Sequence, residues 1–239
     1  MDAIILAAGL GTRLRPHTLT TPKPLLEVRG RPILDWTLGA LPASVERVLV
    51  VVNYLAEQID TYLALQQHFH DWVTVRQPEP RGTGDAVRWC REHLRSDRFL
   101  VLNGDDLYGA ADLEQLSRCP AGLLVHPVEE PHLFGIAFLR PDGTLDHLKE
   151  KPPLVGRQMA NIGAYLFPRN VFDIELSESA RGEYEITDYV SALAARQAFH
   201  VVPASFWLPI GNVEAWQKAQ DVDLESVMKR PTAERGSGP

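Results

Sequence analysis

The sequence predicts an α/β protein with a mixed, mainly parallel sheet, helices on both faces of that sheet and a small β-rich lobe. Two observations carry this prediction. In the first half, short apolar runs alternate with longer helical segments, which is typical of parallel strands joined by right-handed crossovers. In the second half, strand-like segments follow one another with little helix between them, and a Pro141-Asp142-Gly143 turn joins two of them.

The elements follow from this pattern in order. In the first half the predicted strands are 3–8, 47–53, 73–77 and 99–103, and the predicted helices are 33–41, 55–67, 85–95 and 111–118. In the second half the predicted strands are 122–128, 135–140, 144–149 and 161–167, and the predicted helices are 169–176, 187–196 and 213–222. We expect one domain over residues 1–229, with a first part to about residue 120 and a second part from 121. The tail 230–239 has two Pro, two Gly and no bulky apolar residue, so we expect it to be disordered.

Composition excludes several classes of protein. The chain of 239 residues has 24 basic and 31 acidic residues, and its net charge of −7 argues against a broad nucleic-acid surface. No apolar run approaches the ~18 residues of a membrane helix, and no basic segment precedes the first apolar run as in a signal peptide. Cys90 and Cys119 have no metal-site spacing. We therefore expect a cytoplasmic protein that acts on neither membranes nor nucleic acid.

A glycine-bearing loop follows the first predicted strand and carries cations. Gly9 and Gly11 allow the backbone to turn sharply and to expose N–H groups, and Arg13 and Lys23 supply positive charge. This loop predicts a phosphate site. It is not a Walker A loop, because no Lys follows the second Gly, and it lacks the third Gly or Ala of a dinucleotide fingerprint.

Two further motifs lie at predicted strand ends, where open parallel sheets bind ligands. After residue 77 the chain reads Gln77-Pro78-Glu79-Pro80-Arg81-Gly82-Thr83-Gly84, a loop whose Gln offers a donor and an acceptor to a base edge. After residue 103 it reads Gly104-Asp105-Asp106, which puts carboxylates where Mg²⁺ would bridge protein and phosphate. The ordinary alternatives are a flexible loop that caps a helix and a solvated acidic turn.

The first loop, G-L-G-T-R-L followed by P-K, resembles the signature of the sugar-1-phosphate nucleotidyltransferases, and the Q-x-x-x-x-G-T segment resembles their uridylyltransferase and thymidylyltransferase branch. The resemblance continues through Phe134-Gly135, Glu150-Lys151-Pro152, Asn161-Ile162-Gly163 and Glu183-Tyr184-Glu185-Ile186-Thr187-Asp188. It implies a Rossmann-like nucleotidyltransferase fold of the GT-A type, with a sugar-binding lobe in the second part. The implied reaction joins a nucleoside triphosphate, UTP or dTTP preferred, to a sugar 1-phosphate and releases pyrophosphate.

The resemblance also assigns residues. The catalytic residues would be Arg13, Lys23 and Asp105. The nucleotide would be bound by Leu6, Ala8, Gly9, Gly11, Thr12, Arg13, Lys23, Gln77, Gly82, Thr83 and Asp105. The sugar phosphate would be bound by Gly135, Glu150, Lys151, Asn161 and Thr187. The cofactor would be Mg²⁺, held by Asp105.

One departure affects the metal site. Many relatives carry a second metal-binding Asp in an aromatic-x-D-x-G segment, whereas this chain has Trp207-Leu208-Pro209-Ile210-Gly211. Pro209 has no ligating side chain, and Asn212 is the candidate second ligand. Two other readings stay open: a glycosyltransferase that uses a nucleotide-sugar donor, and a catalytically weak regulatory protein that binds nucleotide-sugars. The sequence does not choose the sugar, and it leaves a homo-oligomer open.

Overall fold

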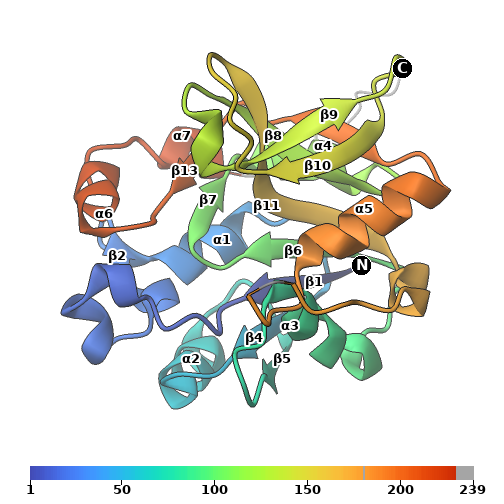
Figure 1. Cartoon of the computed structure of the whole chain (residues 1–239). Coiled ribbons are helices and arrows are strands. Elements are labelled where there is room, and N and C mark those ends of the chain that lie inside the picture. The colour runs from blue at the N-terminus through green and yellow to red at the C-terminus, as the bar shows by residue number, and fades with distance from the viewer. Residues whose placement is uncertain (180, 230–239) are drawn as a thin grey trace, which may run out of the picture.

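The first half of the chain folds as parallel strands connected by helices, in a computed structural model that describes residues 1–179 and 181–229 (Figure 1). The main strands of this half are β1 (Asp2–Leu6), β4 (Arg47–Val52), β5 (Asp71–Arg76) and β6 (Arg98–Asn103). Its helices are α1 (Ile33–Ala40), α2 (Ala56–Leu65), α3 (Thr83–Trp89) and α4 (Ala110–Ser117). β1 pairs in parallel with β4 and β6, and β4 pairs in parallel with β5, so the predicted parallel sheet is confirmed.

The second half extends this sheet with strands that pair mainly antiparallel with their neighbours. Its strands are β8 (Gly122–Val128), β9 (Gly135–Leu139), β10 (Leu145–Glu150), β11 (Gln158–Pro168) and β12 (His200–Pro203), and its helices are α5 (Ile186–Arg196), α6 (Val213–Ala219) and α7 (Glu225–Met228). The strand order is β10-β9-β11-β6-β1-β4-β5, with β8 beside β11 and β12 beside β8. β11 runs antiparallel to β6 and thereby joins the two halves in one sheet.

Two short ribbons complete the strands. β2 (Glu27–Val28) pairs with β3 (Arg31–Pro32), and β7 (Asp106–Tyr108) pairs with β13 (Trp207–Pro209). The second ribbon ties the segment after β6 to a segment about one hundred residues later, and it places Pro209 opposite Asp106.

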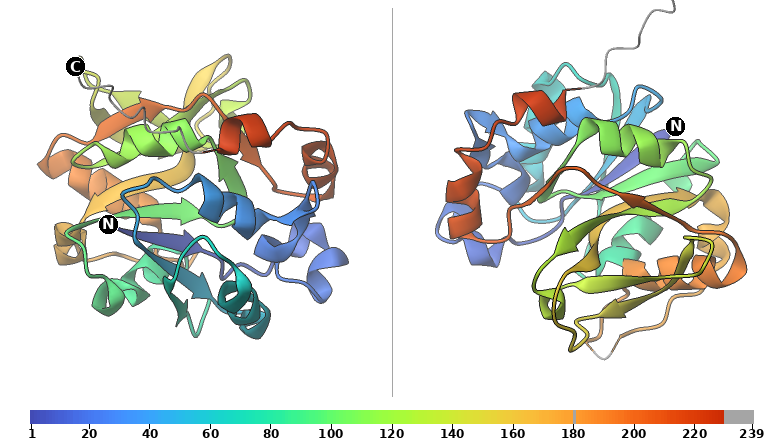
Figure 2. Two further views of the ribbon diagram at one scale, coloured as in Figure 1. Left: turned by 180° about the vertical axis from the view of Figure 1, so that it is seen from behind. Right: turned by 90° about the horizontal axis from the view of Figure 1, so that it is seen from above.

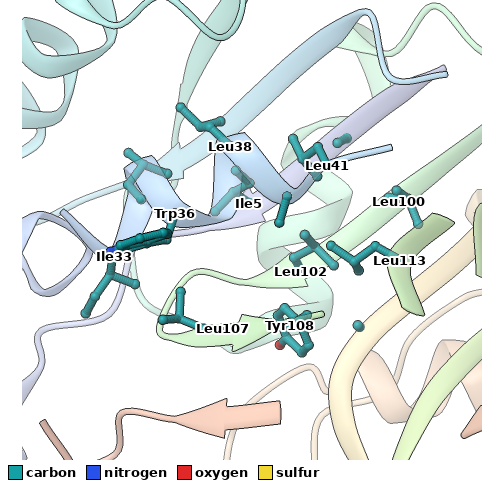
Figure 3. Packing of buried hydrophobic residues seen from close by; sticks show 14 of the residues in the cluster. Ile5, Ile33, Trp36, Leu38, Leu41, Leu100, Leu102, Leu107, Tyr108 and Leu113 are labelled. Atoms are coloured by element: carbon teal, nitrogen blue, oxygen red, sulfur yellow. The ribbon is translucent and has the colours of Figure 1, made fainter. Parts of the chain in front are cut away.

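Helices cover both faces of the sheet, as the apolar strands require. Figure 1 shows α3 and α5 in front of the sheet, and the view from behind in Figure 2 shows α1 and α4 over the opposite face. Each face has its own large cluster of buried side chains. Behind the sheet, Ile5 and Leu102 pack with Trp36 and Leu38 of α1 and with Leu113 of α4 (Figure 3). Burial on both faces explains why the central strands are continuously apolar.

The predicted elements differ from the structure in a few places. The helix predicted over 169–176 is a 3-10 helix, Arg169–Asp173, followed by a segment without regular structure. The helix predicted over 85–95 begins at Thr83 and ends at Trp89, before a 3-10 turn at Arg91–His93. The ribbon strands and β12 were not predicted, because two to four residues carry too short a pattern. The tail predicted to be disordered lies outside the described residues.

Two further observations concern the described residues. Cys90 and Cys119 are free thiols. None of the helices formed by residues 1–179 and 181–229 has the length and apolar character needed to cross a membrane.

Candidate active site

A cavity of about 420 Å³ opens where the parallel strands β1, β5 and β6 end. Strand ends of one direction meet at one edge of a sheet, so loops distant in sequence converge there. The cavity is lined by Leu6, Ala7, Ala8, Gly9, Gly11, Thr12, Arg13, Leu14, Lys23, Pro24, Gln77, Pro80, Gly82, Thr83, Ala86, Asn103, Gly104, Asp105, Glu183, Glu185 and Gly211. Every residue that the sequence assigned to the nucleotide is in this lining.

The glycine loop forms one wall of the cavity and needs its second glycine. Gly11 has a φ of 60°, and a Cβ at this position would lie 2.9 Å from Cγ2 of Thr18. The Thr18 hydroxyl donates to the Gly11 carbonyl at 2.8 Å, which fixes the turn. Arg13 follows on a 3-10 helix, Thr12–Leu14, and its exposed side chain forms no ion pair within the described part of the chain. Its guanidinium is therefore available to an anion.

Lys23 and Asp105 form an ion pair at the centre of the site. Nζ of Lys23 donates to Oδ2 of Asp105 at 2.6 Å, and 8% of the Lys23 side chain is exposed against 40% for Asp105. Asp105 is held at this place by Gly104, whose N–H donates to the carbonyl of Leu6 at 2.9 Å. A Cβ on Gly104 would lie 2.6 Å from that oxygen, so only glycine allows this approach.

The donor set fits a magnesium ion. Asp105 offers hard carboxylate oxygens in a partly open cavity, and Mg²⁺ commonly binds one or two carboxylates together with phosphate oxygens and water. Residues 1–179 and 181–229 contain no group of three or more His, Cys, Asp or Glu side chains arranged for a metal ion. A site built on Asp105 would thus depend on phosphate for its other ligands.

The loop after β5 forms the opposite wall. The Gln77 side chain is buried, and its Nε2 donates to the carbonyl of Gly82 at 3.1 Å and to Oδ2 of Asp85 at 2.9 Å. From the sequence, this amide is predicted to offer both a donor and an acceptor to a ligand. That expectation is wrong for the donor, because both N–H groups are already used within the protein.

This loop is clamped against the segment before α5. The N–H of Tyr184 donates to the carbonyl of Arg81, and the N–H of Gly84 donates to the carbonyl of Tyr184, both at 2.8 Å. Gly82 has a φ of 101°, and a Cβ there would lie 2.4 Å from the Tyr184 oxygen. The hydroxyl of Thr83 accepts from the N–H of Ile186 at 3.1 Å. The same clamp brings Glu183 and Glu185 into the lining, although Thr187 is the one residue of their motif that was predicted to bind substrate.

The residues assigned to the sugar phosphate lie outside this lining. Gly135 and Glu150 face each other across β9 and β10, and the Glu150 carboxylate lies 3.0 Å from where a Cβ on Gly135 would be. Asn161 donates from Nδ2 to the Tyr165 hydroxyl at 2.8 Å. Lys151 has a φ of 43°, and Thr187 lies in the first turn of α5. These positions belong to the second part of the chain, so their sugar-binding role stays a proposal.

The structure gives Asn212 another task. Its Oδ1 accepts from the N–H of Ala215 at 2.8 Å and thereby caps α6. Asn212 is exposed and is not in the cavity lining, whereas its neighbour Gly211 is. Capping engages the oxygen that the sequence analysis assigned to a metal.

Asp106 lies beside the metal candidate but is turned into the protein. Burial, together with the nearby Asp105 carboxylate, raises the pKa of Asp106 to about 8. Nε1 of Trp207, on the facing strand, is buried near this carboxyl group. Asp106 therefore ionises less readily than an ordinary carboxyl group.

A second, larger cavity of about 870 Å³ lies on the outer side of α3. Its lining includes Asp85, Trp89, Phe172 and Tyr189, and it contains none of the residues that the sequence assigned to a function. The chemistry-bearing side chains gather in the smaller cavity, which we take as the candidate active site.

The fold and this cavity define the class of the protein: an α/β domain that gathers phosphate-binding cations and a carboxylate at the ends of mainly parallel strands. The nucleotidyl transferase family model matches residues 2–226, so the chain belongs to the nucleotidyl transferase family. The family predicted from the sequence motifs is confirmed.

Individual relatives agree with this assignment. The bifunctional protein GlmU of Methanocaldococcus jannaschii is 32% identical over 215 residues, which cover 89% of this chain and 52% of that protein. The chain therefore spans about half the length of that relative. The glucose-1-phosphate thymidylyltransferase of Streptomyces griseus is 32% identical over 241 residues, which cover 96% of this chain and 68% of that protein. A crystal structure from Bacillus anthracis, assigned as a glucose-1-phosphate thymidylyltransferase and solved with sucrose, has a TM-score of 0.80 at 26% identity and covers 93% of this chain and 96% of its own. The predicted fold is confirmed.

Proposed function

We propose that this protein transfers a nucleotidyl group from a nucleoside triphosphate to a sugar 1-phosphate, forming a nucleotide-sugar and pyrophosphate. The observation that carries the proposal is the single cavity in which the glycine loop, Arg13, Lys23, Asp105 and Gln77 meet. A triphosphate needs cations and backbone N–H groups for its phosphates, and a base needs a hydrogen-bonding wall at some distance from them.

The phosphates would lie along the glycine loop. Arg13 is free to bind oxygens of the leaving pyrophosphate, and Lys23 would neutralise a second phosphate group. Since Lys23 is buried against Asp105, its ammonium is already desolvated and positioned before the substrate arrives. Such preorganised charge favours the transition state, in which negative charge moves toward the leaving group.

The reaction needs no general base. A phosphate monoester is an anion at neutral pH, so one of its oxygens is a sufficient nucleophile for in-line attack on the α-phosphorus. The protein's contribution is to align the two substrates and to hold the phosphates still. Asp105 would hold Mg²⁺. When bound, Mg²⁺ supplies positive charge that neutralises phosphate oxygens and stabilises the developing charge.

The base is proposed to be uracil or thymine. The Streptomyces griseus relative is a thymidylyltransferase, and the wall formed by Gln77, Gly82 and Thr83 supports a pyrimidine. The sugar is proposed to lie toward β9, β10 and β11, where Glu150 and Asn161 supply hydrogen-bonding groups.

A matrix of nucleoside triphosphates against sugar 1-phosphates tests this function. We expect Mg²⁺-dependent pyrophosphate release only when both substrates are present, with UTP or dTTP fastest. Release of a nucleoside diphosphate from a nucleotide-sugar would instead identify a glycosyltransferase. Nucleotide-sugar binding without turnover of any pair would identify a regulatory protein.

A further inference from the structure

The Gln77 amide is fixed in one orientation by groups that only accept hydrogen bonds. Its Nε2 donates to the Gly82 carbonyl at 3.1 Å and to the Asp85 carboxylate at 2.9 Å. Neither partner can donate a hydrogen bond, because a carbonyl has no proton and Asp85 also accepts from Nε1 of Trp89 at 3.1 Å. Turning the amide over would bring its oxygen against two acceptors, so the network itself selects the orientation.

In this orientation the amide oxygen of Gln77 faces the cavity. Only 3% of Gln77 is exposed, the residue lines the cavity, and within residues 1–179 and 181–229 its Oε1 accepts no hydrogen bond. The backbone of Gln77 is held as well, since its N–H donates to Val52 at 3.0 Å and its carbonyl accepts from Asn53 at 2.6 Å. The cavity wall therefore presents a rigid acceptor at this point.

We propose that Asp85 is a positioning residue that holds the Gln77 amide so that its oxygen, and not its N–H groups, faces a base in the cavity. The site then selects nucleobases that carry an N–H on the ring beside a carbonyl, as uracil, thymine and guanine do. Cytosine and adenine carry a lone pair at that ring nitrogen, and two facing acceptors repel. This inference rests on the proposed function, because it assumes that the base contacts Gln77.

The amino group of cytosine or adenine does not restore the contact without a shift of the base. That group lies one position further along the base edge, so the base would have to slide along the wall. The wall resists sliding, because Gly82 is pressed against the carbonyl of Tyr184 and both chain segments are joined by backbone hydrogen bonds. If a buried acceptor is left unpaired, or faces another acceptor, the affinity for the nucleotide falls by a factor of about ten or more.

Matched nucleotides separate this effect from the size of the base. UTP has a ring N–H beside a carbonyl, whereas CTP has a ring lone pair beside an amino group. ITP and ATP differ in the same way, but on a purine ring. We expect kcat/KM with one sugar 1-phosphate to favour UTP over CTP by at least about tenfold, and ITP over ATP by a similar factor. A wild-type preference for CTP over UTP, or equal use of the two, would overturn the proposal while the proposed function stands.

Two variants test the role of Asp85 itself. Asp85→Leu removes the acceptor, so the UTP-to-CTP ratio should fall toward one, while Asp85→Asn keeps an acceptor oxygen and should retain the ratio within about threefold. An unchanged ratio in a folded Asp85→Leu protein would contradict the positioning role. If Asp85→Leu does not fold, Gln77→Met serves instead, because it removes the cavity acceptor and should abolish the same preference; a retained preference would again overturn the proposal.

Nucleotide binding by calorimetry without the sugar phosphate gives a second measurement. We expect the same order of affinities, UTP above CTP and ITP above ATP. If this order holds but no sugar 1-phosphate supports turnover, the proposed function fails and the base selection stands. If turnover occurs without any order among the four nucleotides, the base selection fails and the function stands.

Discussion

At the residue level, Arg13 and Lys23 are cations of the cavity lining, and we propose that they bind the triphosphate. Arg13→Ala and Lys23→Ala should each lower kcat/KM for the triphosphate by at least about tenfold, because each removes a charge that would face the phosphates. Both proteins should fold, since Arg13 is exposed and Asp105 remains partly solvated without Lys23. Arg15→Ala is the matched control: Arg15 is an exposed cation of the same loop but does not line the cavity. Steady-state pyrophosphate release measures all three, and unchanged kinetics in either cavity variant would remove the triphosphate assignment.

Asn212 is a second residue whose role is open to measurement. Because its Oδ1 caps α6, Asn212→Ala should lower the free energy of unfolding by about 1 kcal/mol and leave the Mg²⁺ requirement unchanged. Asn212→Ser, which keeps a capping oxygen, should recover most of the stability. Denaturant unfolding and a Mg²⁺ titration of activity distinguish the capping role of Asn212 from a metal-binding role. A higher Mg²⁺ requirement at unchanged stability would instead identify Asn212 as a metal ligand.

At the level of elements, the contact between the loop after β5 and the segment before α5 depends on Gly82. Gly82→Ala would place a Cβ 2.4 Å from the Tyr184 carbonyl, so the loop must move away from that segment. We expect KM for the triphosphate to rise by at least about tenfold. Gly143→Ala is the control, because Gly143 shares a positive φ of 83° but has nothing within 4 Å of its Cβ position. Equal effects of the two changes would show that backbone strain, not the clash, is responsible.

A polar cluster joins α1 to α2 and gives stability a defined pH dependence. Asp35 accepts from Arg31 at 2.6 Å and from the Tyr62 hydroxyl at 2.6 Å. Burial raises the pKa of Asp35, but these hydrogen bonds outweigh it, and the pKa lies below its usual value of 3.8. A carboxyl with a lowered pKa stabilises the fold above its unfolded pKa, and this contribution is lost as the pH falls through its folded pKa.

Asp35→Asn should therefore destabilise the protein by about 1–3 kcal/mol at pH 7 and by much less at pH 3 and below. Urea unfolding of the parent protein and the variant at both pH values measures the difference. Tyr62→Phe, which removes one of the hydrogen bonds, should reproduce part of the effect at pH 7. A destabilisation of equal size at both pH values would contradict the ionised role of Asp35.

The elements that the sequence predicted well are those with long patterns. β1, β4 and α1 have continuous apolar or periodic runs, and their approximate positions followed from sequence alone. β7 and β13 have three residues each, and their pairing joins segments about one hundred residues apart, so no local pattern identifies them. The segment after Arg169 resembles a helix in composition but packs as a 3-10 turn, because tertiary contacts outweigh weak propensity.

At the level of the whole molecule, the meeting of the candidate nucleotide-binding residues in one cavity was predictable, because they follow strand ends. Glycines, cations and a carboxylate that follow parallel strands must meet at one edge of the sheet, and the cavity contains all of them. The sequence could not predict what depends on three-dimensional contact. The burial of Lys23 against Asp105 and the single orientation of Gln77 both require partners that only the fold brings together.

Labelled UTP distinguishes attack of a sugar 1-phosphate on the α-phosphorus from attack elsewhere on the triphosphate. With UTP labelled at the α-phosphate, we expect the label in the nucleotide-sugar. With UTP labelled at the γ-phosphate, we expect the label in pyrophosphate, in equal amount. Transfer of the γ-label to the sugar phosphate, or release of inorganic phosphate in place of pyrophosphate, would show that the α-phosphorus is not the point of attack.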